Sequence, residues 1–226
     1  MTTATNIHAP EAPRDFTTNS DFEYWWTIEG EWVEEPNERR NGWSGVVMVR
    51  DHKTLYYVKR QFNHRCYTVR HPFGWPTVSR EWHYLKRLER LGLTAPEPVF
   101  HGTRRVSGGI EAVLVTRELR DFVSLDKLSG LSSQQMSRLT DMLGDELGKL
   151  HRAKLQHSCL YDKHVMVRWD GDTPRVALID LEKMRSRLTV GNAARHDLKQ
   201  FQRRQKLISP TEWPRLEQAH RRSLSR

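Results

Sequence analysis

The chain has 226 residues, of which 37% are hydrophobic and 29% are charged, and its formal net charge is +9. The mean hydropathy is −0.75, and the sequence has no apolar run near the ~20 residues that span a bilayer, which argues against an integral membrane protein. The length suits one domain of two lobes or two small domains. The two cysteines, Cys66 and Cys159, are expected to be free thiols in a reducing compartment.

Residues 1–20 are rich in Thr, Ala and Pro and show no apolar periodicity, so we expect a disordered lead. This stretch lacks the basic and apolar regions of a secretory signal. The positive charge favours an anionic partner, whether a nucleotide, a nucleic acid or an acidic membrane surface. The sequence has neither zinc-finger spacing nor an aromatic RNA-binding signature, so nucleic-acid recognition would rest on charge alone.

The first half of the chain is predicted to be mostly strands. Apolar and alternating runs predict strands at 45–51, 54–62 and 110–119. Two segments are expected to be irregular, namely 71–76, which breaks the chain, and 95–105, which is extended or looped. A helix is predicted over 77–93, with Thr77 or Ser79 as its cap and Gly92 at its end.

The second half is predicted to be mostly helical. The longest helix is expected over 132–155, a hairpin over 164–180, a helix over 195–205 and then a short basic helical tail. The resulting fold class is α+β. We expect an N-lobe over 21–118, made of a β-sheet and one helix, and a helical C-lobe over 119–226, with a hinge near 116–125.

Lys59 and Glu81 are the first candidate functional residues. Lys59 lies in a predicted strand that is apolar on both faces, so we expect it to be shielded from solvent. Glu81 shares a helix face with Leu85 and Leu88, and a carboxylate on a buried face needs a partner. A strand lysine followed by a helix glutamate is the pair that protein kinases use on nucleotide phosphates. Alternatively, Glu81 interacts only with the helix dipole and Lys59 is a surface residue.

The predicted hairpin provides a second pair. Its two strands bring His164 close to Asp180, at the end facing the loop that starts at His157. An Asp that ends a buried strand is suited to bind a metal ion, although it can equally cap the next turn.

Three segments resemble the lipopolysaccharide kinase (Kdo/WaaP) family, especially its InaA-like members. They are 56–81, 150–167 and 176–185, and the resemblance extends from about Gly42 to Phe201. It implies a compact, protein-kinase-like fold of two lobes, ATP with Mg²⁺ or Mn²⁺, and a position in the bacterial cytoplasm.

The resemblance also implies roles for individual residues. Lys59 would contact phosphate, Glu81 would hold Lys59, and Asp180 and His164 would bind the metal. Gly42 and Gly45 would form a phosphate-covering turn, with Thr116 and Glu118 completing the nucleotide site. Asp197 would brace the catalytic loop, in which His157, Cys159, Asp162 and Lys163 are the candidate catalytic residues.

Cys159 departs from the kinase pattern, because it occupies the position of the usual catalytic Asp. A thiol beside phosphates and a carboxylate is a poor base. Asp162 would substitute for the usual catalytic Asp, or it is only a turn residue. Lys163 would balance the charge of the transferred phosphoryl group, or it is only a solvated surface residue. His164 replaces the Asn of protein kinases, which predicts a preference for Mn²⁺.

The segment between Asp180 and Asp197 is too short to hold a peptide substrate as protein kinases do. The expected acceptor is therefore an anionic saccharide or glycolipid, with possible peripheral contact at the inner face of the inner membrane. The alternative is a pseudokinase, a nucleotide-binding regulatory or stress-response protein. The oligomeric state stays open.

Overall fold

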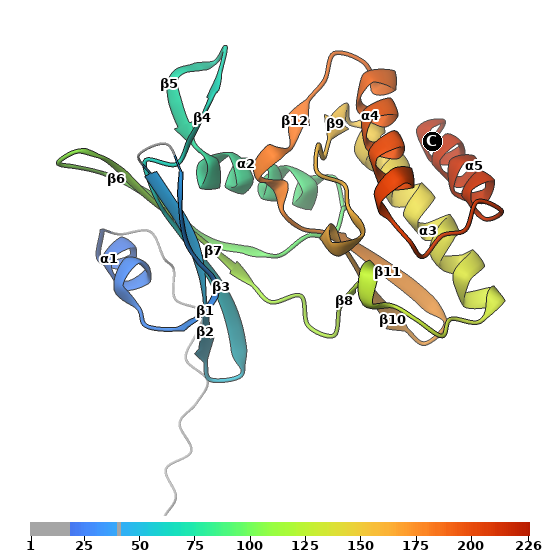
Figure 1. The fold of residues 1–226 in the computed structure, drawn as a ribbon, viewed down its shortest axis with the longest axis horizontal. Coiled ribbons are helices and arrows are strands. Elements are labelled where there is room, and N and C mark those ends of the chain that lie inside the picture. Colours follow the sequence, from blue (N-terminus) through green and yellow to red (C-terminus); the bar gives the residue numbers. More distant parts are fainter. Residues whose placement is uncertain (1–18, 40–41) are drawn as a thin grey trace, which may run out of the picture.

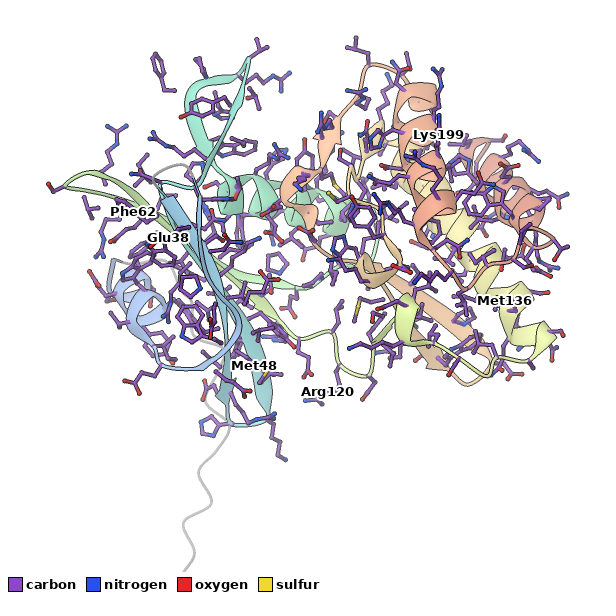
Figure 2. All side chains as sticks on the ribbon, viewed as in Figure 1. Glu38, Met48, Phe62, Arg120, Met136 and Lys199 are labelled. Carbon is purple, nitrogen blue, oxygen red and sulfur yellow. The ribbon has the colours of Figure 1, made fainter. Side chains whose placement is uncertain are left out.

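The computed structural model describes residues 19–39 and 42–226. It has an N-terminal lobe built on a sheet and a C-terminal lobe built mainly of helices (Figure 1). In Figure 2 Phe62 and Met48 mark the sheet lobe, Met136 and Lys199 mark the helical lobe, and Arg120 lies in the segment that joins them. The predicted α+β class with two lobes is therefore confirmed.

An antiparallel sheet forms the N-lobe, in the strand order β1-β2-β3-β7-β6. Its strands are β1 Glu31–Arg39, β2 Gly42–Asp51, β3 Thr54–Phe62, β6 Pro98–Val106 and β7 Gly109–Arg117. The β3 strand is central and pairs with β2 and β7, which explains why its sequence is apolar on both faces. The segment 95–105, which is expected from the sequence to be extended or looped, mostly belongs to strand β6 and pairs with β7.

Two helices cover the two faces of this sheet. Helix α1, Asn19–Thr27, buries Phe22 and Trp25 against one face. Helix α2, Thr77–Arg90, packs against the other face and against the C-lobe. Neither α1 nor β1 is predicted from the sequence. The last two residues of the predicted disordered lead begin α1, and residues 1–18 lie outside the described residues.

The segment between β3 and α2 is a hairpin, so the predicted chain break at 71–76 is wrong. Strand β4, Arg65–Thr68, pairs with β5, His71–Pro76. Pro76 caps α2 without a side-chain hydrogen bond, so the predicted Thr77 or Ser79 cap is wrong as well. The Thr77 hydroxyl instead accepts a hydrogen bond from Gln61 Nε2 at 2.7 Å. Gly92 has a φ of +66° at the predicted end of the helix.

The C-lobe is organised around α3, Ser133–Arg152, whose N-terminus carries a capping box of Ser132 and Gln135. Helix α5, Trp213–Leu224, packs along it, because Gly144 and Gly148 allow the two backbones to approach closely. The C-terminal segment is thus a packed helix with a buried apolar face and not only a basic tail.

The remaining elements of the C-lobe are short strands, 3-10 helices and one further helix. They are β8 Val123–Ser124, η1 Leu125–Lys127, β9 Leu155–Gln156, η2 Asp162–His164, β10 Val165–Asp170, β11 Thr173–Leu178, η3 Leu181–Lys183, β12 Arg185–Ser186 and α4 Val190–Arg204. The β10–β11 pair is the predicted hairpin. Within the described ranges, no helix is long and apolar enough to cross a membrane.

Candidate functional site

A cleft of about 790 Å³ lies between the two lobes. Strands of the sheet and helix α2 line it from the N-lobe, and the segments around η2 and η3 line it from the C-lobe. Most of the residues predicted to be functional contribute to its wall, namely Lys59, Glu81, Thr116, Glu118, Cys159, Lys163, His164 and Asp180. The fold therefore gathers one site from both halves of the chain.

Lys59 and Glu81 face each other between β3 and α2. Lys59 Nζ lies 3.0 Å from Glu81 Oε2, and the two side chains are only 16% and 12% exposed. Glu81 points inward because it lies one turn before Leu85, on the buried face of α2. The ion pair that the strand and helix patterns predict is present.

Glu182 reaches the same lysine, although the sequence patterns do not predict it as a functional residue. Its Oε2 lies 3.1 Å from Lys59 Nζ. Burial by itself would lower the pKa of Lys59, but the carboxylates of Glu81 and Glu182 raise it well above its usual range. Burial would raise the pKa of Glu182, and Lys59 holds it below its usual range. The signal available in the sequence was its place two residues after Asp180.

Asp180 and His164 form the second pair of the cleft, with Asp180 Oδ2 at 3.3 Å from His164 Nε2. His164 Nδ1 lies 2.8 Å from the carbonyl oxygen of Cys159. A carbonyl only accepts, so Nδ1 carries hydrogen and donates it. With Nδ1 engaged at this carbonyl, Nε2 is the ring nitrogen that faces the Asp180 carboxylate.

The backbone of Asp180 is left-handed, with φ 59° and ψ 60°. This conformation is uncommon for residues other than glycine and gathers at functional sites. It turns the chain sharply out of β11 and into η3, so that Asp180 and Glu182 both line the cleft.

Asp197 of α4 holds the loop that begins at His157. Its fully buried carboxylate accepts hydrogen bonds from the backbone N–H of His157 at 2.6 Å and of Ser158 at 3.0 Å. Its Oδ2 also lies 3.3 Å from His151 Nε2. Burial would raise the pKa of Asp197, but these partners, His151 first, lower it below its usual range. The contacts are those that a loop-bracing Asp would make.

His157 lies behind this loop, in contrast to its prediction as a catalytic residue. Its side chain is fully buried, and its Nε2 lies 3.0 Å from the carbonyl oxygen of Ile179. It is not among the residues that line the cleft. His157 connects the loop to the end of β11, and its ring does not line the cleft.

Gly42 and Gly45, the residues predicted to form a phosphate-covering turn, lie within strand β2 and are not among the residues that line the cleft. A Cβ at Gly42 would come within 2.5 Å of the Phe62 carbonyl oxygen, and one at Gly45 within 2.7 Å of the Trp32 ring. Both glycines therefore serve close packing in the sheet. Ser44 lines the cleft in their place, and the connection between β1 and β2 falls at 40–41, outside the described residues.

Residues 23–220 match the lipopolysaccharide kinase (Kdo/WaaP) family, which covers most of the chain. The chain belongs to this family.

One relative supports the assignment of this Kdo/WaaP family member, and two solved structures share its fold. It is 36% identical to Protein InaA of Escherichia coli (strain K12) over 199 residues, which cover 85% of this chain and 92% of InaA. Its fold is similar to that of WaaP in complex with acyl carrier protein, with a TM-score of 0.69, 20% identity, and coverage of 89% of this chain and 82% of that chain. It is also similar to the Rio2 kinase–ADP/Mg²⁺–phosphoaspartate complex from Chaetomium thermophilum, with a TM-score of 0.51, 17% identity, and coverage of 86% and 71%. The predicted protein-kinase-like fold is confirmed.

Cys159 lies in the cleft wall of this Kdo/WaaP family member and is 5% exposed. Burial raises the pKa of its thiol, and the positive charge of Lys183 offsets this only in part. The thiolate is therefore disfavoured at neutral pH. Cys66 and Cys159 are both free thiols, as predicted.

Asp162 lines a neighbouring pocket of about 680 Å³ and not the cleft. Tyr161 and Lys163 line both cavities, and Arg204 and Lys206 add positive charge to the second one. Asp162 Oδ1 accepts a hydrogen bond from the backbone N–H of Lys163 at 3.0 Å. Asp162 thus stands beside the cleft in a pocket on the same loop, which we call the basic pocket because its three basic side chains outnumber two acidic ones, Asp126 and Asp162.

Proposed function

We propose that this chain is an ATP-dependent phosphotransferase of the InaA type, which phosphorylates a hydroxyl of an anionic saccharide. The observation that carries the proposal is the arrangement of two pairs in one cleft: Lys59 with Glu81, and Asp180 with His164. A lysine held by a helix glutamate contacts nucleotide phosphates in kinases, while a carboxylate opposite it binds the metal ion. Membership of the Kdo/WaaP family supports a lipopolysaccharide core sugar as acceptor.

The nucleotide in this proposal spans the cleft. Its phosphates lie at Lys59, and its nucleoside lies near Thr116 and Glu118, where β7 leads into the segment that joins the lobes. The β3 strand, the end of β7 and α2 are packed elements, so the charged groups are held in place before the ligand arrives.

Asp180 and His164 suit a divalent metal ion, because Nδ1 of His164 donates to a backbone carbonyl and leaves Nε2 directed at Asp180. Across the described residues, no group of three or more His, Cys, Asp or Glu side chains forms a complete metal cage. Phosphate oxygens and water would therefore supply the other ligands, which is usual for metal–nucleotide sites. When bound, the ion neutralises charge on the transferred phosphoryl group.

The acceptor in this proposal enters through the basic pocket beside the cleft. Lys163, Arg204 and Lys206 would attract an anionic sugar, and the shared residue Tyr161 leads from this pocket to the cleft. The sugar hydroxyl attacks the γ-phosphorus, the bond to the β-phosphate oxygen breaks, and ADP leaves. Asp162 accepts the hydroxyl proton, since the thiol of Cys159 is a poor base.

A pseudokinase is the second candidate function, and two observations favour it. Cys159 occupies the position of the usual base, and Glu182 pairs with the lysine that would contact phosphate. In that case the cleft binds a nucleotide with little or no transfer, and the protein acts as a regulatory or stress-response component.

Calorimetric titration with ATP, in Mg²⁺ and separately in Mn²⁺, tests the proposal. Lys59→Ala and Asp180→Ala should each weaken metal-dependent binding by about tenfold or more. The matched controls are Lys86→Ala, an exposed lysine of α2, and Asp172→Ala, an exposed aspartate of the β10–β11 turn. The controls should bind as the wild type does.

Transfer of radiolabelled phosphate from ATP to purified lipopolysaccharide core then separates the two candidate functions. Binding with transfer establishes the enzyme, and binding without transfer favours the pseudokinase. Failure to bind ATP with either metal would contradict both candidates.

A further inference from the structure

The β4–β5 hairpin projects from the sheet lobe between the strand of Lys59 and the helix of Glu81 (Figure 1). Three of its large apolar side chains face solvent: Tyr67 is 66% exposed, Phe73 is 90% exposed and Val69 is fully exposed at 101%. Scattered apolar side chains are common on protein surfaces, but three on one short projecting hairpin are not.

The charged residues next to these side chains along the chain have one sign. The sequence has no Asp or Glu between Asp51 and Glu81. The hairpin itself carries Arg65 and Arg70, together with His71. An apolar tip flanked only by positive charge matches an anionic, partly apolar surface.

Local contacts hold the hairpin in this projecting position. The rings of His71 and Trp75 stack at 4.4 Å, and Trp75 meets His83 of α2 edge to face at 5.9 Å. The backbone N–H of His71 donates to the Thr68 hydroxyl at 3.1 Å across the turn. The apolar side chains at the tip are therefore displayed by a braced element and are not the result of a loose loop.

We propose that the β4–β5 hairpin is an interfacial anchor that places Tyr67, Val69 and Phe73 in the headgroup region of an anionic phospholipid bilayer. Phospholipid phosphates would contact Arg65 and Arg70, while the rings and the valine enter the boundary with the acyl chains. This membrane attachment goes beyond the proposed phosphotransferase activity and can be measured without turnover. It would hold the cleft next to a membrane surface, because the hairpin leads directly into α2.

Co-sedimentation of the full chain with vesicles tests the proposal. The probes are vesicles of phosphatidylethanolamine and phosphatidylglycerol, and vesicles of phosphatidylcholine alone. We expect binding to the anionic vesicles only, a loss of about tenfold in affinity for Phe73→Ser, and a further loss for the double variant with Val69→Ser. Arg70→Glu should also weaken binding, and added salt should reduce the difference between Arg70→Glu and the wild type.

Leu188→Ser is the matched control, because Leu188 is an exposed apolar residue of the C-lobe, at 89% exposure. It should bind vesicles as the wild type does. Equal losses for Leu188→Ser and Phe73→Ser, or no preference of the wild type for anionic vesicles, would overturn the proposal. Analytical ultracentrifugation without lipid tests whether the hairpin instead binds a second copy of the chain. A wild-type dimer that Phe73→Ser converts to monomer would show that it does and would overturn the membrane proposal.

Discussion

The Glu182 carboxylate lies 3.1 Å from the ammonium group of Lys59. Lys59 is also the residue proposed to contact the nucleotide phosphates. Glu182 and a phosphate therefore compete for one positive charge. The ion pair links η3 of the C-lobe to β3 of the N-lobe, so nucleotide binding and the contact between the lobes depend on the same lysine.

Replacing Glu182 with Gln is expected to tighten binding of Mg–ATP by roughly threefold to tenfold, because it removes a negative charge that competes with the phosphates. Calorimetry on the two proteins measures the change. Glu81→Gln serves as the comparison and should weaken binding, because Glu81 holds Lys59 in place. Weaker binding by Glu182→Gln would show that Glu182 contributes to the nucleotide–metal site and does not compete with it.

Cys159→Asp is expected to raise the rate of phosphoryl transfer, but by less than the roughly 10²–10⁴-fold that a positioned general base contributes, because Asp162 already accepts the proton in the proposed reaction. Cys159→Ser should give no such increase, because it adds no group that accepts a proton at neutral pH. ATP turnover with a saccharide acceptor measures both variants. A rate for Cys159→Asp equal to that of the wild type would mean that the position of Cys159 is not that of a base.

The imidazole of His164 is expected to favour Mn²⁺ over Mg²⁺, because nitrogen ligands suit transition metals better than magnesium. We expect ATP to bind about tenfold more tightly with Mn²⁺. His164→Asn should remove most of this preference, since it replaces the nitrogen with an amide oxygen. Calorimetry in each metal gives the ratio, and tighter binding of Mg–ATP by the wild type would contradict the assignment of His164.

Asp197→Asn is expected to destabilise the protein by about 3 kcal/mol, or roughly 6–12 °C in Tm. The buried carboxylate accepts two backbone N–H groups, and an amide in its place would direct an NH₂ group at one of them. Thermal unfolding of the variant measures this loss. Asp172→Asn, at an exposed position, is the control and should unfold as the wild type does.

His101 is expected to make stability depend on pH below neutrality. Burial lowers its pKa to about 4, from 6.5 in the unfolded chain. As the pH falls, the unfolded state binds a proton near 6.5, while the folded state does so only near 4. The contribution of neutral His101 to the free energy of unfolding is therefore present in full above pH 6.5 and is lost as the pH falls toward 4.

His101→Gln should reduce the drop in Tm between about pH 7 and pH 4.5 by several degrees, and keep a polar group near the Ser79 hydroxyl, which lies 2.9 Å from His101 Nε2. The exposed His52 provides the control variant His52→Gln. An identical pH dependence in all three proteins would contradict the role of His101.

Local patterns in the sequence identified most of the elements that carry the cleft. The apolar faces around Lys59 and the spacing of Glu81, Leu85 and Leu88 predict a buried strand and helix, and an Asp-Gly turn predicts the hairpin that joins His164 to Asp180. Each of these patterns is contained in a stretch of about twenty residues or fewer, which is the range over which apolar periodicity and turn residues determine local structure. The order of these motifs then indicated the family.

Contacts between distant segments were decided by the tertiary structure alone. Glu182 meets Lys59 and His157 is buried, while α1 covers an apolar face of the sheet and β1 forms its edge. None of these follows from local spacing, because each depends on which surfaces the packed lobes bring together and remove from water. Local sequence patterns thus predict most of the elements around the cleft, the Lys59–Glu81 pair and the family. Only packing decided which carboxylates share the lysine and which side chains reach the cleft, since burial and charge pairing are properties of the whole fold.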